Sequence, residues 1–500
     1  MFVKLYSGGF FGLETFPVEV QVDLSNGLPF FNIVGLADTA VKEAKERVRS
    51  AIKNSGFTFP AKRLTVNLSP SDRKKSGSLY DLPIALGVLA ASGVFDGNGW
   101  DGTVFLGELA LSGEIKPVRG VLAIVLGLRK SGFKKFFVPP GNAGELELIK
   151  DIEVFTANTL GEIVKGNAQR VAYSAKSTRS VLTYPLDFAD VKGQRQAKRV
   201  LEIAVAGFHH AAMVGTPGSG KSMLAKRVPT IMPPMEEWEI LEVSQIYSVA
   251  GLLSNGLVTE RPFRSPHYTA SETALIGGGN VPTPGEISLA HRGVLFMDEL
   301  PEFNRKVLEV LRQPLEDGKV LISRANYKVE FPSKFLWITA LNPCPCGNYK
   351  HPYRECICKP SQIRRYLRKI SSPLWDRIDL KIWVNPVEEK LLLEKSREEP
   401  SEVIRKRVLR AVEIQKERNP EGKFNGELNN AQLEKVLTLE SAAEKLIAKA
   451  MDKLRLSARS YFKLLKVCRT IADLEGSQTV KTKHVSEALS YIREPLEVSA

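Results

Sequence analysis

The sequence predicts an α/β protein in three parts: a first α/β domain, a central domain of strand–loop–helix units, and a helical region. Three observations carry this prediction. Strand and helix patterns alternate over residues 1–166, an apolar strand leads through a glycine-rich loop into a helix at 211–228, and patterns beyond residue 388 are almost all helical. At 500 residues, the chain has room for about three domains of about 150 residues each.

The composition is that of a soluble globular protein, with 43% hydrophobic and 25% charged residues, which excludes a disordered chain. Lys and Arg number 70 against 56 Asp and Glu, and a net charge of +14 favours an anionic partner, with nucleic acid first. No signal peptide or membrane-spanning stretch is apparent, so we expect a cytoplasmic protein without a membrane partner.

The first domain, 1–166, should contain strands at 18–24, 63–70, 103–109 and 134–140 and helices at 37–55, 81–92 and 120–131. Residues 167–186 are expected to form a linker, because apolar periodicity is lost there. The central domain then runs over 187–387 and the helical region over 388–500.

The glycine-rich loop fits the phosphate-binding pattern G-x4-G-K-S, with a strand before it and a helix after it. Glycines let backbone N–H groups face phosphates, and the helix N-terminus adds positive potential. A lysine reaches the β and γ phosphates, and the following serine ligates Mg²⁺. The predicted nucleotide-binding residues are Gly215, Thr216, Pro217, Gly218, Ser219, Gly220, Lys221 and Ser222.

Two further apolar strands end in polar residues. Asp298 and Glu299 end one of them, and we expect Asp298 to join Ser222 at Mg²⁺ while Glu299 polarises the attacking water. Asn342 ends the next strand, where an amide can orient that water, although an asparagine that starts a turn would look the same.

Two arginines are candidates for stabilising the charge that develops in phosphoryl transfer. Arg377 lies within SSPLWDRIDL and Arg459 within LSARSYFKLL. From spacing alone, an arginine at either position is more often a surface ion-pair partner.

Four of the five cysteines lie within 344–358, spaced C-x-C-x9-C-x-C. Four thiolates on one loop can close a tetrahedron around a structural Zn²⁺, with buried or redox thiols as the alternative. His351 is a spare candidate ligand. The predicted zinc ligands are Cys344, Cys346, Cys356 and Cys358.

Two basic segments fit phosphate backbones. Residues 350–369 are rich in Lys and Arg with interleaved tyrosines, and 320–331 predicts a hairpin with basic residues at its tip, while Gly277–Gly279 marks a second loop. A solvated basic face or a subunit contact is the alternative. The predicted DNA-binding residues are Arg324, Lys328, Arg364, Arg365 and Arg368.

Three stretches carry a family resemblance: residues 263–303, LNPCPCG at 341–347 and PLWDRIDL at 373–380. They resemble the magnesium-chelatase-like AAA+ ATPases, most closely the branch that contains a competence helicase. The resemblance implies an AAA+ P-loop core with an α-helical lid, Arg377 as a finger acting on a neighbouring subunit, and Arg459 as the lid arginine. It also implies ATP and Mg²⁺ as cofactors, a homo-hexameric ring, single-stranded or branched DNA, and recombination proteins as possible partners.

Residues 107–146 resemble the proteolytic domain of Lon. At the positions that match its serine nucleophile and basic lysine, this chain has Leu79 and Leu122, with Ser78 and Ile124 as neighbours. A Ser–Lys dyad needs both groups, so we expect a catalytically dead protease fold.

Together with the motifs, the resemblance to the magnesium-chelatase-like ATPases implies a hexameric DNA motor driven by Mg²⁺–ATP, a helicase for branch migration in recombination and natural transformation. Remodelling of a protein partner without DNA is the alternative, and an ATP-dependent protease is disfavoured.

Overall fold

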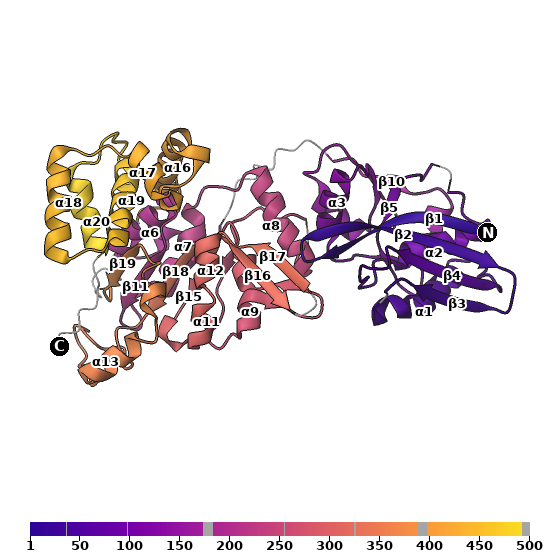
Figure 1. The fold of residues 1–500 in the computed structure, drawn as a ribbon, viewed down its shortest axis with the longest axis horizontal. Helices are drawn as coiled ribbons and strands as arrows, with labels where there is room; N and C mark the ends of the chain where they lie inside the picture. The colour runs from indigo at the N-terminus through magenta and orange to yellow at the C-terminus, as the bar shows by residue number, and fades with distance from the viewer. Residues whose placement is uncertain are drawn as a thin grey trace.

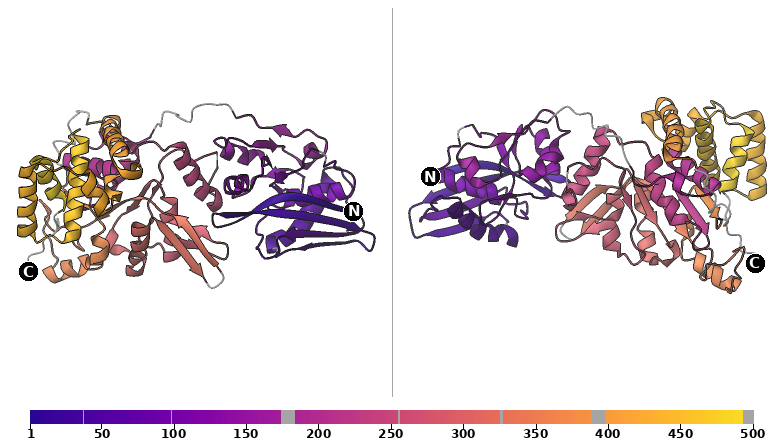
Figure 2. Two further views of the ribbon diagram at one scale, coloured as in Figure 1. Left: turned by 45° about the horizontal axis from the view of Figure 1, so that its top comes forward. Right: turned by 180° about the vertical axis from the view of Figure 1, so that it is seen from behind.

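The computed structural model is elongated, and the N-terminal domain, the central domain and the helical region follow one another along its long axis (Figures 1 and 2). Some segments covered by the sequence predictions lie outside the described residues. They are Ala37, the hairpin tip at 325–326, much of the expected linker, the start of the helical region and the C-terminal residues. The structure describes residues 1–36, 38–97, 99–173, 184–254, 256–324, 327–387 and 398–492.

The N-terminal domain is built on an eight-stranded mixed sheet with the order β10-β9-β8-β5-β1-β2-β4-β3. Its strands are β1 (Phe2–Phe11), β2 (Glu14–Ser25), β3 (Phe30–Val34), β4 (Arg63–Ser69), β5 (Thr103–Phe105), β8 (Lys135–Phe137), β9 (Glu153–Thr156) and β10 (Gln169–Arg170). A small hairpin adds β6 (Glu108–Leu109) and β7 (Ile115–Lys116). The helices are α1 (Thr39–Asn54), α2 (Asp81–Ala91), α3 (Val121–Lys130), α4 (Pro140–Ala143) and α5 (Leu160–Val164).

Two details of this domain differ from the sequence prediction. The strand expected at 103–109 divides into β5 and β6, because the backbone of Gly107 bonds outside the sheet: its N–H donates to the carbonyl oxygen of Leu79 and its carbonyl oxygen accepts the N–H of Leu82, both at 3.1 Å. β10 lies within the span expected to be linker, and it pairs antiparallel with β9 at the sheet edge.

The central domain contains a five-stranded, fully parallel sheet with the order β12-β15-β18-β11-β19. Every residue of β11, β15 and β18 is buried, which is the pattern of a parallel sheet covered by helices on both faces. The strands are β11 (Ala211–Gly215), β12 (Phe263–Arg264), β15 (Val294–Met297), β18 (Leu336–Leu341) and β19 (Leu380–Val384). Because the strands are parallel, their carboxyl ends meet at one edge.

The remaining elements of this domain are helices around the sheet and two small hairpins. The hairpins are β13 (Gly277–Gly278) with β14 (Thr283–Pro284), and β16 (Lys319–Arg324) with β17 (Tyr327–Pro332). The helices are α6 (Arg195–Gly207), α7 (Lys221–Ile231), α8 (Glu237–Ala250), α9 (Glu272–Ile276), α10 (Glu286–Leu289), α11 (Arg305–Glu309), α12 (Arg312–Asp317), α13 (Pro360–Leu367) and α14 (Ser372–Trp375).

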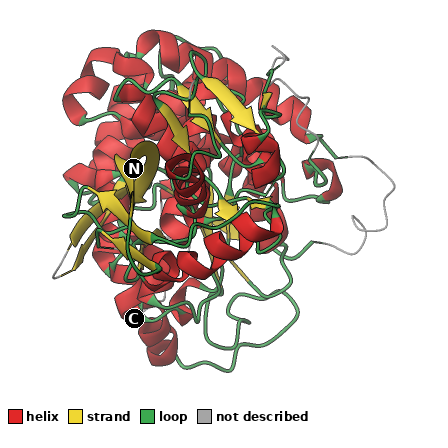
Figure 3. Cartoon of the chain, turned by 90° about the vertical axis from the view of Figure 1, so that its right-hand side faces the viewer, coloured by secondary structure: helices red, strands yellow, loops and turns green. Residues whose placement is uncertain are grey.

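The C-terminal region is helical, as predicted, and its apolar faces share one core with α6 and the sheet. This mixed α/β architecture confirms the predicted fold class. Figure 3 shows the helices and strands with the N-terminal domain toward the viewer. The helices are α16 (Ser401–Arg418), α17 (Asn430–Val436), α18 (Ser441–Leu454), α19 (Ala458–Leu474) and α20 (Thr482–Ile492).

Among the described residues, the N-terminal domain packs on the central domain around α8 and at the β16–β17 hairpin. In the first of these contacts, α3 packs against α8, where Ser248 Oγ donates to the buried carboxylate of Glu145 at 3.0 Å. In the second, the β1–β2 turn packs on the β16–β17 hairpin, with the rings of Phe11 and Tyr327 edge to face at 5.3 Å. A Cβ at Gly12 would lie 2.2 Å from Val329 Cγ1, so this turn fits closely against the hairpin.

Candidate nucleotide site and its surroundings

The glycine-rich loop joins the end of β11 to the start of α7. Gly218 and Gly220 have φ of +78° and +89°, and a Cβ at either would meet nothing within 4 Å. The loop therefore keeps an open face beside the helix N-terminus, as a bound phosphate requires. On the other side the fit is tight, because a Cβ at Gly215 would lie 2.3 Å from the carbonyl oxygen of Val384 in β19.

Lys221 is folded over this loop. Its Nζ donates to the carbonyl oxygens of Gly215 at 2.7 Å and Thr216 at 2.9 Å, and it lies 3.4 Å from Asn342 Oδ1. Burial lowers the pKa of Lys221 to about 8, although Asp298 and Glu299 act to raise it. A nearly buried ammonium that is held by neutral carbonyls is ready to exchange them for phosphate oxygens.

The two acids after β15 have different surroundings. Ser222 Oγ donates to Asp298 Oδ2 at 2.5 Å, which brings together the two oxygen groups predicted for Mg²⁺. Glu299 is exposed, and its φ of +52° is left-handed. That conformation costs a non-glycine residue about 1–3 kcal/mol, and such strain is typical of functional sites. Asp298 Oδ1 accepts the N–H of Glu299 at 2.9 Å.

The four predicted cysteines lie together directly after Asn342. Their sulfurs all fall within 4.8 Å of one another. Cys344 Sγ is 3.4 Å from Cys346 Sγ, and Cys356 Sγ is 3.7 Å from each of them. Zn–S bonds of about 2.3 Å in a tetrahedron place sulfurs about 3.8 Å apart, so the arrangement fits such a metal. Cys358 completes the set.

Two residues shape this cysteine loop (344–358). His351 is not part of the cluster of sulfurs; its Nδ1 accepts the N–H groups of Tyr353 at 3.0 Å and Arg354 at 3.1 Å. Gly347 packs on the phosphate loop, and a Cβ there would lie 2.6 Å from Pro217 Cγ. The cysteine loop and the phosphate loop are therefore in contact.

Sequence reasoning missed a second part of the site. Gln194, just before α6, donates from Nε2 to the carbonyl oxygens of Ser219 at 3.0 Å and Asn385 at 2.6 Å. A cavity of about 230 Å³ opens beside it, lined also by Gly193 and Trp383. The available signal was the dipeptide Gly193–Gln194 before a helix, but its partner after β19, Asn385, is distant in sequence.

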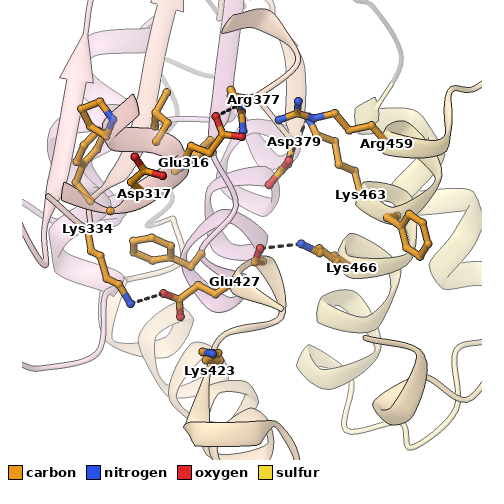
Figure 4. Close-up of a pocket in the computed structure, with 18 of the residues that line it drawn as sticks. Glu316, Asp317, Lys334, Arg377, Asp379, Lys423, Glu427, Arg459, Lys463 and Lys466 are labelled. Atoms are coloured by element: carbon orange, nitrogen blue, oxygen red, sulfur yellow. Dashed lines mark hydrogen bonds and ion pairs between the residues drawn. The ribbon is translucent and has the colours of Figure 1, made fainter. Parts of the chain in front are cut away.

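The two predicted arginines lie elsewhere. Both line a cavity of about 680 Å³ between the central domain and the helical region, and no residue of the phosphate loop lines it (Figure 4). Arg377 Nη2 donates to Glu316 Oε2 at 2.6 Å, and its Nε is buried without a partner among the described residues. Arg459 is exposed at the start of α19.

The five predicted DNA-binding residues are all exposed, and no ion pair is seen for them within the described part of the chain. Arg324 and Lys328 lie beside the hairpin tip, on β16 and β17. Arg364 and Arg365 lie on the outer face of α13, with Arg368 at its end, while Tyr366 faces the interior and is only 5% exposed. Tyr366 is therefore unavailable for base stacking, unlike Tyr353, which is 83% exposed.

Apolar side chains occupy the positions expected to match the Lon dyad. Leu79 is 3% exposed, and Leu122 and Ile124 are completely buried. Ser78 Oγ donates to a Glu108 carboxylate oxygen rather than to an amine. The N–H of Leu122 donates to Glu145 at 3.3 Å, so this part of α3 contributes to the domain contact.

Comparisons with known proteins place this chain in a family. Three family models match this chain. The model "Magnesium chelatase, subunit ChlI" matches residues 187–392, and "Magnesium chelatase, subunit ChlI C-terminal" matches residues 398–492. The model "Subunit ChlI of Mg-chelatase" matches residues 20–142. Competence protein ComM of Haemophilus influenzae is 44% identical, with 97% of this chain and 96% of ComM covered. This chain belongs to the magnesium-chelatase-like ATPases of the ComM/YifB type.

Other relatives agree. The uncharacterized protein YifB of Escherichia coli is 41% identical, with 96% of this chain and 95% of YifB covered. Lon protease 2 of Bacillus subtilis is 27% identical over a part that makes up 32% of this chain and 30% of that protease. The family implies ATP and Mg²⁺ as nucleotide and metal. Among the described helices, none has the length and apolar composition needed to cross a membrane.

Proposed function

We propose that this chain is a ring-forming motor, driven by Mg²⁺–ATP, that moves DNA and catalyses branch migration. Lys221 would neutralise the β and γ phosphates, and Ser222 and Asp298 would hold Mg²⁺, which supplies Lewis-acid charge at the transferred phosphoryl group. Glu299 would polarise the attacking water, and Asn342, at hydrogen-bond distance from Lys221, would orient it. Gln194 and the cavity beside it would hold the base of the nucleotide.

The observation that carries this proposal is the position of the two arginines. Arg377 and Arg459 line a cavity to which the phosphate loop of their own chain contributes nothing (Figure 4). Phosphoryl transfer needs cationic groups close to the γ phosphate. A second copy of the chain that presents its phosphate loop to this cavity would complete both sites, and repetition of that head-to-tail contact closes a ring. A hexamer is the proposed size.

DNA is the proposed substrate because of the exposed cations and the name of the relative. The relative ComM is named a competence protein. The unpaired guanidinium groups on α13 and the basic residues beside the hairpin tip present charge where no acidic side chain neutralises it among the described residues. Because phosphate contacts carry no sequence information, binding should be independent of sequence and steeply dependent on salt.

Three variants test the ATPase part. Lys221→Ala should lose nucleotide binding, since the buried ammonium is the main counter-charge of the loop. Glu299→Gln should bind ATP but not hydrolyse it, and nucleotide-binding and phosphate-release assays separate the two defects. Full activity of Glu299→Gln would refute the assignment. Arg377→Ala should hydrolyse ATP poorly alone. Its activity should recover when it is mixed with Glu299→Gln, because a Glu299→Gln neighbour supplies the intact Arg377 to a subunit with an intact Glu299.

The DNA part is tested by the ATPase rate without DNA and with single-stranded, duplex and four-way-junction DNA. We expect stimulation by DNA, and the double variant Arg324→Ala with Lys328→Ala should reduce it. Lys319→Ala is the matched control, because Lys319 lies on the same hairpin but pairs with Glu330 at 3.0 Å. If no DNA binds at low salt with ATP present, the DNA motor is excluded in favour of a remodeller of a protein partner.

A further inference from the structure

Arg377 and Arg459 come from two separate elements that meet at the cavity. Arg377 lies in the turn between α14 and β19, and Arg459 lies at the start of α19 in the helical region. Neither arginine holds the other, because Arg377 bonds to Glu316 of α12 and Arg459 is exposed. Something else must fix their spacing if both are to act on one phosphate group.

Lys463 provides a direct link. It follows Arg459 by one helical turn on α19, so the two side chains share a face of that helix. Its Nζ donates to the carbonyl oxygens of Asp376 and Ile378, the residues on either side of Arg377, with the second bond 3.0 Å long. Figure 4 shows Lys463 and the two arginines close together at one end of the cavity.

Asp379 makes the link rigid. Its Oδ1 is 3.3 Å from Lys463 Nζ, and its Oδ2 is 3.2 Å from His209 Nδ1. The other nitrogen of His209, Nε2, lies 2.8 Å from Thr470 Oγ1, further along α19. Burial alone would raise the pKa of Asp379, but the hydrogen bond with His209 and the charge of Lys463 lower it below its ordinary value, so the group is a carboxylate.

The backbone of this turn is also held. The N–H groups of Asp379 and Leu380 both donate to the carbonyl oxygen of His210, at 2.9 and 3.0 Å. The side chains of Lys463 and Asp379 are only 15% and 16% exposed, so water competes weakly for the link. The turn that carries Arg377 is thus attached to α19 at two points, through Lys463 and through His209.

We propose that Lys463 is a positioning residue that holds Arg377 and Arg459 as one unit, so that both reach the nucleotide of a neighbouring copy together. The inference rests on the proposed function, because it assumes that the arginines act across a subunit contact. A displacement of about 1 Å in a catalytic group costs up to about 100-fold in rate, which is why a shared anchor matters.

The test uses the full-length chain. Lys463→Met keeps most of the apolar stem and removes the donor. We expect kcat for ATP hydrolysis to fall about 10–100-fold with KM changed less than about twofold, because the variant's own phosphate loop is intact. Lys463→Arg should restore most of the activity, since it can donate to the same two carbonyl groups.

Lys416→Met is the matched control. Lys416 of α16 also joins the helical region to the central domain, through Glu236, but it does not line the cavity. Its variant should keep kcat. Equal losses of kcat in Lys416→Met and Lys463→Met, or no recovery in Lys463→Arg, would show that Lys463 acts only on stability and would overturn the inference.

Mixed assemblies separate this inference from the proposed function. In a mixture with Glu299→Gln, each Lys463→Met subunit supplies an intact Glu299 and receives ordered arginines from its neighbour, so the activity should exceed that of both parents. The mixture of Arg377→Ala with Glu299→Gln is the reference. If only the reference recovers, the positioning role is wrong and the shared site stands; if neither recovers, the shared site and this inference both fall.

Discussion

Replacing Gly347 by alanine tests whether the cysteine loop supports the phosphate loop. The added Cβ would lie 2.6 Å from Cγ and 2.7 Å from Cδ of Pro217. Carbon atoms in contact are normally about 3.5–4.0 Å apart, so one loop must move by about 1 Å. Because a displacement of that size costs up to about 100-fold, we expect kcat/KM for ATP to fall about 10–100-fold, mainly through KM.

Gly476→Ala is the matched control for the backbone strain that an alanine at position 347 would introduce. Gly347 has φ of +80°, and Gly476, after α19, has φ of +67° with nothing within 4 Å of its added Cβ. Both alanine variants therefore carry a left-handed penalty of about 1 kcal/mol, but only one presses on Pro217. Steady-state ATPase and nucleotide-binding assays compare them. Equal kcat/KM values in the two variants would refute the coupling between the loops.

Three further predictions concern the metal, the pH dependence and the domain contact. Cys356→Ser should reduce zinc from about one per chain to none in elemental analysis, and the KM for ATP should rise as the loop loosens; zinc-free parent protein would contradict this. The pKa of Lys221 is lowered to about 8, so the ammonium loses its charge as the pH rises above 8, and ATP affinity should weaken by up to about tenfold per pH unit. Lys221→Arg should remove that dependence. Binding titrations at pH 7–10 measure both. Gly12→Ala should speed hydrogen exchange in the β16–β17 hairpin, because its Cβ collides with Val329, whereas Gly56→Ala, with open space around it, should leave the hairpin unchanged.

Local patterns predicted the parts of the site that are continuous in sequence. The phosphate loop, the strand that ends in Asp298 and the cysteine spacing each occupy one short segment, and the neighbouring strand and helix patterns gave their context. The exposed arginines of α13 could likewise be read from one helix, although the inward direction of Tyr366 could not, because it depends on which face packs.

Contacts between distant segments were not predictable. Gln194 meets the carbonyl oxygen of Asn385 across 191 positions, and Lys463 meets that of Ile378 across 85. Both bonds go to backbone carbonyl groups, which every residue has, so no residue type at the accepting position marks them. The cavity that holds Arg377 and Arg459 exists only once the helical region packs on the sheet.

The contact between the N-terminal domain and the β16–β17 hairpin imposes a thermodynamic reciprocity. Tyr327 of β17 packs on Phe11 of the β1–β2 turn, and its hydroxyl donates to the carbonyl oxygen of Gly279 at 2.5 Å. One side chain of the β16–β17 hairpin therefore contacts both the N-terminal domain and the loop at Gly279. Any ligand that shifts the hairpin must work against this docking free energy. If a partner bound to the N-terminal domain changes the affinity of the hairpin for its ligand by some factor, linkage requires that this ligand change the affinity for the partner by the same factor.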